Sequence, residues 1–245
     1  MGNGVFVAGT DTGVGKTLVS AALVRRLVRL GCSVGVMKPV ETGVSSDTPD
    51  RSDAARLIAA AQVDDSLDLV SPYRFPLPLA PLSAASAQGQ VIELSEILDR
   101  FRQLSARHSC VVVEGAGGLL VPMGQDWDLR DLICRLRLPV VLVGRVGLGG
   151  VNHALLTVEA LARKKIPVVS LILNETAVPS GSIQLEQQAS TLALLRQRVS
   201  VPVLGPLPYQ PHVDGAWPDA VDDAAESLPI SQLGETVMTM VAGRP

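Results

Sequence analysis

Aromatic residues are scarce in this sequence, and it carries no surplus of positive charge. Phe, Trp and Tyr make up 3% of its 245 residues, which is too few to favour a platform on which nucleic-acid bases stack. The formal net charge is −3, whereas a basic face is the expected footprint of a nucleic-acid-binding protein. Basic residues are dispersed, and Arg25, Arg26 and Arg29 are expected on the solvent side of the first helix. Nucleic acid is therefore not an expected partner.

Cysteines are also few, and long apolar runs are missing. Cys32, Cys110 and Cys134 lie within apolar stretches and lack the spacing of a metal site. We expect reduced, buried thiols in a cytoplasmic protein, and no zinc. No apolar run is long enough to cross a bilayer, and the first strand is expected to begin too close to the N-terminus to leave room for a signal peptide. A membrane is not an expected partner either.

Short runs of β-branched residues alternate along the chain with segments of helical periodicity. Strands are expected at 5–8, 34–37, 110–113, 140–143, 168–173 and 201–204, and helices at about 18–24, 52–62, 94–106, 152–164 and 184–198. Each apolar strand has the pattern of burial on both faces. The sequence therefore predicts a doubly wound α/β fold, with a mostly parallel sheet and helices on both faces, in one domain spanning 1–245. The proline-rich stretch 71–81 is expected to be an ordered loop against the site.

The segment from Gly9 to Thr17 reads GTDTGVGKT and falls between the first expected strand and the first expected helix. In such a turn, backbone N–H groups and the positive end of the helix dipole converge on one point, where an anion is stabilised. Lys16 would reach the terminal phosphates, and the Thr17 hydroxyl would hold magnesium. The sequence thus predicts a nucleoside triphosphate site of the P-loop NTPase type.

The phosphate loop is a variant of the common motif. Five residues separate Gly9 from Gly15, one more than usual. A neighbouring group of ATPases carries a second lysine early in the loop, where this chain has Asp11 and Thr12. This difference argues against a switch that assembles through such a lysine.

Charged residues follow three other expected elements. Glu114 ends the strand 110–113, where a carboxylate would position magnesium beside the loop threonine, although a solvated strand end is the alternative. Lys38 follows the second strand and is either a surface charge or a group that neutralises a transferring phosphoryl group. Asp53 follows Ser52 at a helix start, where capping and the helix dipole explain it as well as a metal role does.

In this order the segments resemble dethiobiotin synthetases, ATP-dependent enzymes of biotin synthesis. The resemblance covers nearly the whole chain, through motifs at 9–17, 38–43, 52–54, 72–75, 80–81, 114–118 and 147–157. It implies that 7,8-diaminononanoate takes up CO2, supplied with bicarbonate, as a carbamate whose oxygen attacks the γ-phosphate of ATP. The second amine then displaces phosphate from the carbamic-phosphoric anhydride, which closes the ring and leaves dethiobiotin, ADP and phosphate.

The resemblance also implies roles for individual residues. It assigns Lys38, Lys16 and Thr12 to catalysis, and Thr17, Asp53 and Glu114 to Mg2+. The implied ATP contacts are Thr12, Gly13, Val14, Gly15, Lys16, Thr17, Asp53, Glu114, Gly115, Ala116, Gly117, Asn174, Pro206, Leu207 and Pro208. The implied substrate contacts are Thr42, Gly117, Gly149, Gly150, Val151 and Asn152, the last four at a helix N-terminus that would take the substrate carboxylate. Family members are usually homodimers, which makes a homodimer the expectation here.

Two other classes share the loop and the sheet. A partitioning-type ATPase needs the early loop lysine that this chain lacks. A cobyrinate-type amide ligase usually carries a second domain with a nucleophilic cysteine, whereas Cys110 falls within an expected strand. Gly13 stands where some dethiobiotin synthetases have an acidic residue, Asn174 is also compatible with a turn residue, and 210–228 matches no pattern of the family.

Overall fold

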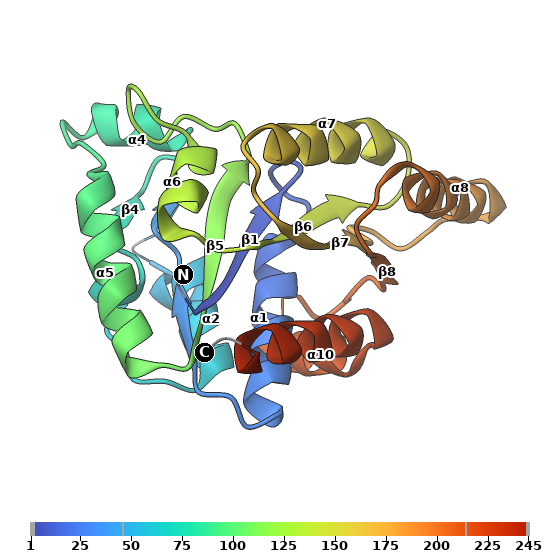
Figure 1. Cartoon of the computed structure of the whole chain (residues 1–245), viewed down its shortest axis with the longest axis horizontal. Helices are drawn as coiled ribbons and strands as arrows, with labels where there is room; N and C mark the ends of the chain where they lie inside the picture. Colours follow the sequence, from blue (N-terminus) through green and yellow to red (C-terminus); the bar gives the residue numbers. More distant parts are fainter. Residues whose placement is uncertain (1–2, 46, 214, 244–245) are drawn as a thin grey trace.

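A six-stranded parallel sheet forms the centre of the molecule (Figure 1). The computed structural model describes residues 3–45, 47–213 and 215–243. The strand order is β2-β5-β1-β6-β7-β8, and every pair of neighbours is parallel. The strands of this sheet are β1 (Gly4–Gly9), β2 (Val34–Met37), β5 (Cys110–Gly118), β6 (Val140–Arg145), β7 (Val168–Asn174) and β8 (Val203–Leu207). This arrangement confirms the predicted fold class.

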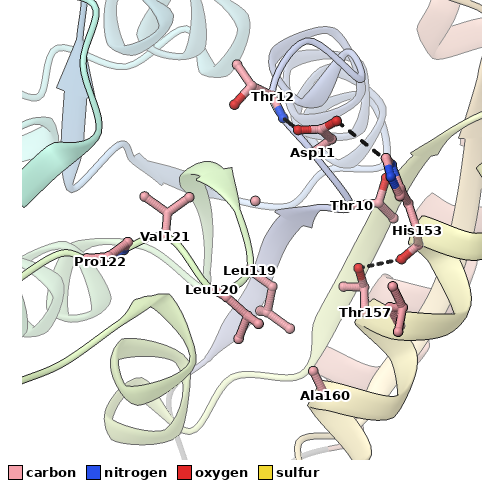
Figure 2. A pocket seen from close by; sticks show the side chains of 12 residues that line it. Thr10, Asp11, Thr12, Leu119, Leu120, Val121, Pro122, His153, Thr157 and Ala160 are labelled. Atoms are coloured by element: carbon pink, nitrogen blue, oxygen red, sulfur yellow. Dashed lines mark hydrogen bonds and ion pairs between the residues drawn. The ribbon is translucent and has the colours of Figure 1, made fainter.

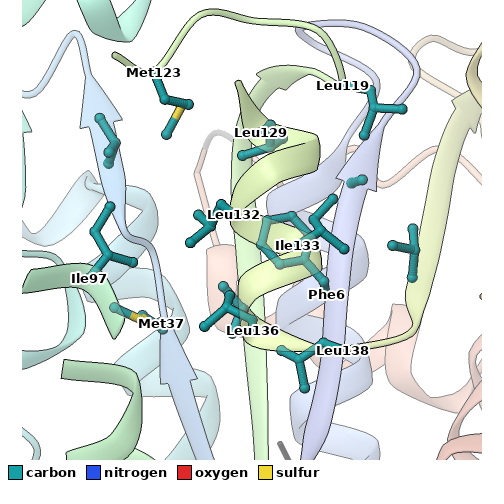
Figure 3. Packing of buried hydrophobic residues seen from close by; sticks show 14 of the residues in the cluster. Phe6, Met37, Ile97, Leu119, Met123, Leu129, Leu132, Ile133, Leu136 and Leu138 are labelled. Carbon is teal, nitrogen blue, oxygen red and sulfur yellow. The ribbon is translucent and has the colours of Figure 1, made fainter. Parts of the chain in front are cut away.

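Helices cover both faces of the sheet, because the apolar residues of each strand alternate between two hydrophobic clusters. In β1, Phe6 and Ala8 belong to one cluster, and Val5 and Val7 belong to the other. Figure 3 shows the Phe6 side, where residues of α6 pack on the sheet. That face carries α5 (Leu94–Arg107), α6 (Leu129–Leu136), α7 (Gly150–Arg163) and α8 (Ser182–Arg198). The opposite face carries α1 (Lys16–Arg29), α2 (Asp53–Ala61), α9 (Trp217–Glu226) and α10 (Leu228–Ala242).

Several elements were not expected from the sequence. The helices α6, α9 and α10 are among them, together with the short helices η1 (Pro49–Arg51), α3 (Leu67–Val70) and α4 (Pro81–Ala87). The stretch 71–81 is not simply a loop, because β4 (Tyr73–Phe75) pairs in parallel with β3 (Val40–Thr42) in a separate two-stranded sheet. Strand pairing and the burial of Tyr73 and Phe75 explain why this stretch is ordered. Glu114 lies inside β5 rather than at a strand end, since pairing with β1 continues to Gly118.

The arginines of α1 lie on its solvent side, as expected: Arg29 is exposed, and Arg25 and Arg26 are half-buried. Arg25 and Arg29 also form ion pairs with Asp222 of α9, at 3.2 and 2.9 Å. The expectation of buried thiols is wrong for two of the cysteines, because only Cys110 is buried, whereas Cys32 is half-buried and Cys134 is exposed. None of the helices in the described part of the chain is long and apolar enough to span a membrane.

Candidate nucleotide-binding site

The phosphate loop lies at the carboxyl edge of the sheet, between β1 and α1. Gly13 and Gly15 adopt φ values of 72° and 90°, a left-handed conformation that favours glycine. A Cβ at Gly15 would lie 2.1 Å from the amide nitrogen of Asn174. That amide nitrogen donates a hydrogen bond to the Val14 carbonyl at 3.1 Å, while the side-chain oxygen Oδ1 of Asn174 is buried without a partner among the described residues. Glycine therefore allows the loop to approach β7.

Lys16 is buried in the loop and has few protein acceptors. Its Nζ donates to the carbonyl of Asp11 at 3.0 Å. Burial, followed by repulsion from Lys38, lowers the pKa of Lys16 to about 8. A polyanion bound at this position would offset both effects, because negative charge close to an ammonium favours its charged form.

Lys38 bridges two carboxylates, one from Glu114 inside β5 and one from Asp53 at the start of α2. Its Nζ lies 2.6 Å from Glu114 Oε1 and 2.7 Å from Asp53 Oδ2, and it also donates to the carbonyl of Gly115 at 3.4 Å. Burial alone would lower the pKa of Lys38, but Glu114 and Asp53 raise it above its ordinary value. Lys38 is accordingly an ammonium held in the interior by two anions.

Oxygen ligands gather beside Lys38 in a set that fits a hard divalent cation. The Thr17 hydroxyl donates to Glu114 Oε1 at 3.0 Å, and Glu114 Oε2 is buried without a partner among the described residues. Burial opposes ionisation of Asp53, but the charge of Lys38 and hydrogen bonds from Lys38 and Thr17 lower its pKa. The described chain has no group of three His, Cys, Asp or Glu side chains arranged for a metal. The set suits Mg2+, which is usually held by one or two carboxylates together with substrate phosphates.

Glu41 was missed by the sequence analysis although it orients Asp53. Its carboxylate accepts the backbone N–H groups of Asp53 at 2.5 Å and Ala54 at 3.2 Å, at the start of α2. Ser52 caps the same helix by accepting from Ala55 at 3.1 Å, as predicted. Burial raises the pKa of Glu41. Its position in β3, an element not predicted, is the reason that no sequence signal identified it.

A cleft of about 330 Å³ joins these groups. The predicted residues that line it are Thr12, Gly13, Gly15, Lys16, Thr17, Lys38, Thr42, Asp53, Glu114, Ala116 and Gly117. Arg56, Val213 and Trp217 line it too and were not predicted. Asn174, Pro206, Leu207 and Pro208 lie at the ends of β7 and β8 and do not line the cleft.

The predicted substrate contacts on α7 lie elsewhere. Gly149, Val151 and Asn152 line a separate hollow of about 660 Å³ between α7 and α8, and Gly150 is buried at the first position of α7. Between the two regions, a third hollow of about 430 Å³ runs from Thr12 to His153 (Figure 2). Within one chain, Thr42 and Asn152 therefore do not share a cavity.

The class of protein follows from these features. A glycine-rich loop between β1 and α1, with a buried carboxylate on the adjacent parallel strand, defines a P-loop nucleoside triphosphatase. A solved structure of the MinC:MinD cell division protein complex from Aquifex aeolicus has the same fold, with a TM-score of 0.55 at 14% identity, covering 99% of this chain and 97% of that chain. A family model described as an AAA domain matches residues 3–216.

Sequence comparison identifies the particular family. The chain is 44% identical over 210 residues to an ATP-dependent dethiobiotin synthetase of Anaeromyxobacter dehalogenans, covering 86% of this chain and 92% of that relative. It is 39% identical to the corresponding protein of Thermodesulfovibrio yellowstonii, covering 84% and 88%, and 35% identical to that of Bacillus subtilis subsp. natto, covering 84% and 87%. The chain belongs to the dethiobiotin synthetase family.

Proposed function

We propose that the protein uses ATP and CO2 to close the ureido ring of dethiobiotin on 7,8-diaminononanoate, through a carbamate and a carbamic-phosphoric anhydride. The relatives that it matches over most of their length are named ATP-dependent dethiobiotin synthetases. The observation that carries the proposal is the Lys38 ammonium between Glu114 and Asp53 beside the phosphate loop. Each step of the reaction forms or moves negative charge, and a preorganised buried cation stabilises such charge strongly.

The residues have separate tasks in this scheme. Thr17, Asp53 and Glu114 would hold Mg2+, which supplies positive charge at the phosphates when bound. Lys16 holds the terminal phosphates against the loop, with Thr12 donating to a phosphate oxygen. The remaining implied ATP contacts are the loop glycines with Val14, the stretch 115–117 beside them, and Asn174 with 206–208 for the base. The side-chain oxygen Oδ1 of Asn174, buried without a described partner, supports a contact to a donor on the base.

Lys38 carries the chemistry of the carbamate. One amine of the substrate forms a bond to the carbon of CO2 and loses a proton to solvent, and Thr42 and Lys38 hold the resulting anion. Its oxygen attacks the γ-phosphorus as the bond to ADP breaks. The second amine then bonds to the carbamoyl carbon and gives up a proton to the departing phosphate, the bond from that carbon to the phosphate oxygen breaks, and the ring closes. The protein mainly positions the reacting groups and stabilises their negative charge, and such a reaction needs little covalent work from the protein.

A homodimer would complete the substrate site. Gly149, Val151 and Asn152 line a different hollow from Thr42 in one chain, so one diamine cannot contact both sets within a single hollow. Leu148 is 83% exposed and Ile183 is 72% exposed beside the α7–α8 hollow, and exposed apolar patches mark interaction sites. Mixing Lys38→Ala with Asn152→Ala chains tests this arrangement. Shared sites would recover about one quarter of the wild-type activity, since half of the dimers are mixed and each has one intact site.

The decisive experiment measures phosphate release from ATP with Mg2+ and bicarbonate, with and without 7,8-diaminononanoate, while dethiobiotin is followed by mass. Release that requires the diamine and matches the product one to one supports the proposal. ATP hydrolysis at the same rate with and without the diamine would favour a partitioning-type ATPase. Phosphate release that requires ammonia would favour an amide ligase. We also propose that 1–245 form one domain, since both hydrophobic clusters pack on one sheet. The proposed location is the cytoplasm, where ATP is available.

A further inference from the structure

Arg56 and Trp217 meet at the phosphate cleft, and the roles given above use neither of them. Arg56 lies on α2, three residues after Asp53, and Trp217 is the first residue of α9. The guanidinium carbon of Arg56 lies 4.2 Å from the centroid of a Trp217 ring. Both side chains line the cleft that also contains Lys16 and Lys38. The third cation of the cleft is therefore fixed by contact with an aromatic ring.

The contact with Trp217 leaves the hydrogen-bonding capacity of Arg56 available. A guanidinium has five N–H donors in a planar fork, and its attraction to an aromatic ring does not require an oxygen or nitrogen acceptor for any of them. Within the described ranges of the chain, no acceptor receives a hydrogen bond from Arg56. Two of these N–H groups, side by side, match the spacing of two oxygens of a phosphate or carboxylate in a bidentate contact. The Trp217 ring thus holds a fork whose acceptors are not supplied by the described protein.

The charges around the cleft indicate the kind of acceptor. The charged side chains that line the cleft are Lys16, Lys38, Arg56, Glu41, Asp53 and Glu114. Lys16 donates to the backbone carbonyl of Asp11, and Lys38 is paired with the carboxylates of Asp53 and Glu114. Without Arg56 the carboxylates would outnumber the cations, and the lining would repel a polyanion.

We propose that Arg56, held by Trp217, is a nucleotide-binding residue that donates two hydrogen bonds to the polyphosphate of ATP. Trp217 is a positioning residue that acts through Arg56. The inference rests on the proposed function in that it takes ATP as the nucleotide. It gives a role to the start of α9, which lies in the stretch 210–228 that no family motif covers.

The test is calorimetric titration of the full chain with ATP and with inorganic tripolyphosphate, both with Mg2+ and without the diamine. Arg56→Ala should raise Kd for both ligands about tenfold, because a charge-assisted bidentate contact is lost. Arg56→Lys keeps the charge but not the fork, and should recover only part of that loss. Arg51→Ala removes an exposed arginine of η1 and serves as the matched control, with no change expected.

Trp217 requires its own pair of variants. Trp217→Ala should raise Kd for tripolyphosphate by a few-fold, and Trp217→Phe, which keeps an aromatic face, should restore it. A loss of fold would lower the thermal midpoint in both variants and would not separate them, so rescue by Phe distinguishes positioning from stability. In steady-state assays the Arg56 variants should raise KM for ATP more than they lower kcat.

The outcomes separate this inference from the proposed function. Wild-type affinity in Arg56→Ala would overturn the inference, and so would full affinity in Arg56→Lys, which would mean that charge alone suffices. A loss for ATP but not for tripolyphosphate would also overturn it, because the contact would then be to the nucleoside. Failure of the wild-type chain to bind either ligand would instead overturn the proposed nucleotide site as a whole.

Discussion

Glu114 and Asp65 are both buried carboxylates with basic partners, but they lie at opposite edges of the sheet and differ in how completely they are hydrogen-bonded. Asp65 contacts His108, which precedes β5, at 2.6 Å, and it accepts from Arg107 at 3.0 Å. His108 in turn lies 3.2 Å from the Ser33 hydroxyl, which precedes β2. Both oxygens of Asp65 therefore have partners, and we call these four residues the amino-edge cluster.

The carboxyl-edge cluster of Lys38, Asp53 and Glu114 leaves polar capacity unused. Glu114 Oε2 is buried without a partner among the described residues, and Lys38 is shared between two anions. Buried polar groups in folded proteins are nearly always satisfied, so an exception calls for an explanation such as a ligand or an ion. The comparison indicates that a closed network stabilises the fold, whereas an open one marks the place where something binds.

Substitution of Lys38 should have the largest effect, and on activity. Lys38→Ala removes the cation beside the reacting groups, and we expect kcat to fall by about 10²- to 10³-fold while Lys16 and the loop still bind ATP. Steady-state kinetics and calorimetric titration with ATP measure the two quantities separately. Lys164→Ala, which breaks an exposed ion pair with Asp131, is the control. A rate near that of the wild type would remove Lys38 from the mechanism.

Substitution of Asp65 should affect stability instead. Asp65→Ala leaves the ring N–H of His108 without its acceptor, which should cost about 2 kcal/mol in the free energy of unfolding. Urea denaturation measures this loss, and kcat should stay within about twofold of wild type because the cluster is far from the cleft. Asp68→Ala removes the carboxylate of an exposed ion pair with Arg74 and should change stability little. A large loss of kcat in Asp65→Ala at full folding would contradict the assignment.

Most of the fold could be predicted from sequence, because strands buried on both faces have a strong local pattern. The unpredicted helices α9 and α10 pack on the sheet through contacts with elements that are distant in the sequence. Asp222 and Glu226 of α9 pair with Arg25 and Arg29 of α1, and no local signal links residues that are so far apart in the chain. The same distance explains why these ion pairs were not predicted.

The residues of the site also differ in how far they could be predicted. Lys16 and Thr17 end the phosphate-loop motif, and Glu114 lies near the carboxyl end of an apolar strand, so motifs with a known mechanism identify them. The sequence left Asp53 open between capping and metal binding. Ser52 caps the helix and the Asp53 carboxylate contacts Lys38, while its metal role stays a prediction. Arg56 and Trp217 come together only through tertiary packing, and so no motif contains them.

Cysteine reactivity offers a finer test of the amino edge. A hydrogen bond from Cys110 lowers the pKa of Cys32 to about 7, although burial opposes this. At pH 7 the half-buried Cys32 should react with iodoacetamide roughly tenfold faster in wild type than in Cys110→Ala, where its thiolate fraction falls. Peptide mass mapping gives the rates, and the exposed Cys134 provides the internal reference. Equal Cys32 rates in both proteins would mean that the two thiols are not coupled.

Two serine caps make the smallest but most direct comparison of the two edges. Ser52 caps α2 by accepting from Ala55 at 3.1 Å, and Ser66 caps α3 by accepting from Leu69 at 3.3 Å. Replacing either by Ala should cost about 1 kcal/mol in the free energy of unfolding. Only Ser52→Ala should also raise KM for ATP, because α2 places Asp53 and Arg56 in the cleft, whereas Ser66 adjoins Asp65 of the amino-edge cluster. If both variants lose equal stability and have equal KM for ATP, the start of α2 does not position the carboxyl-edge cluster.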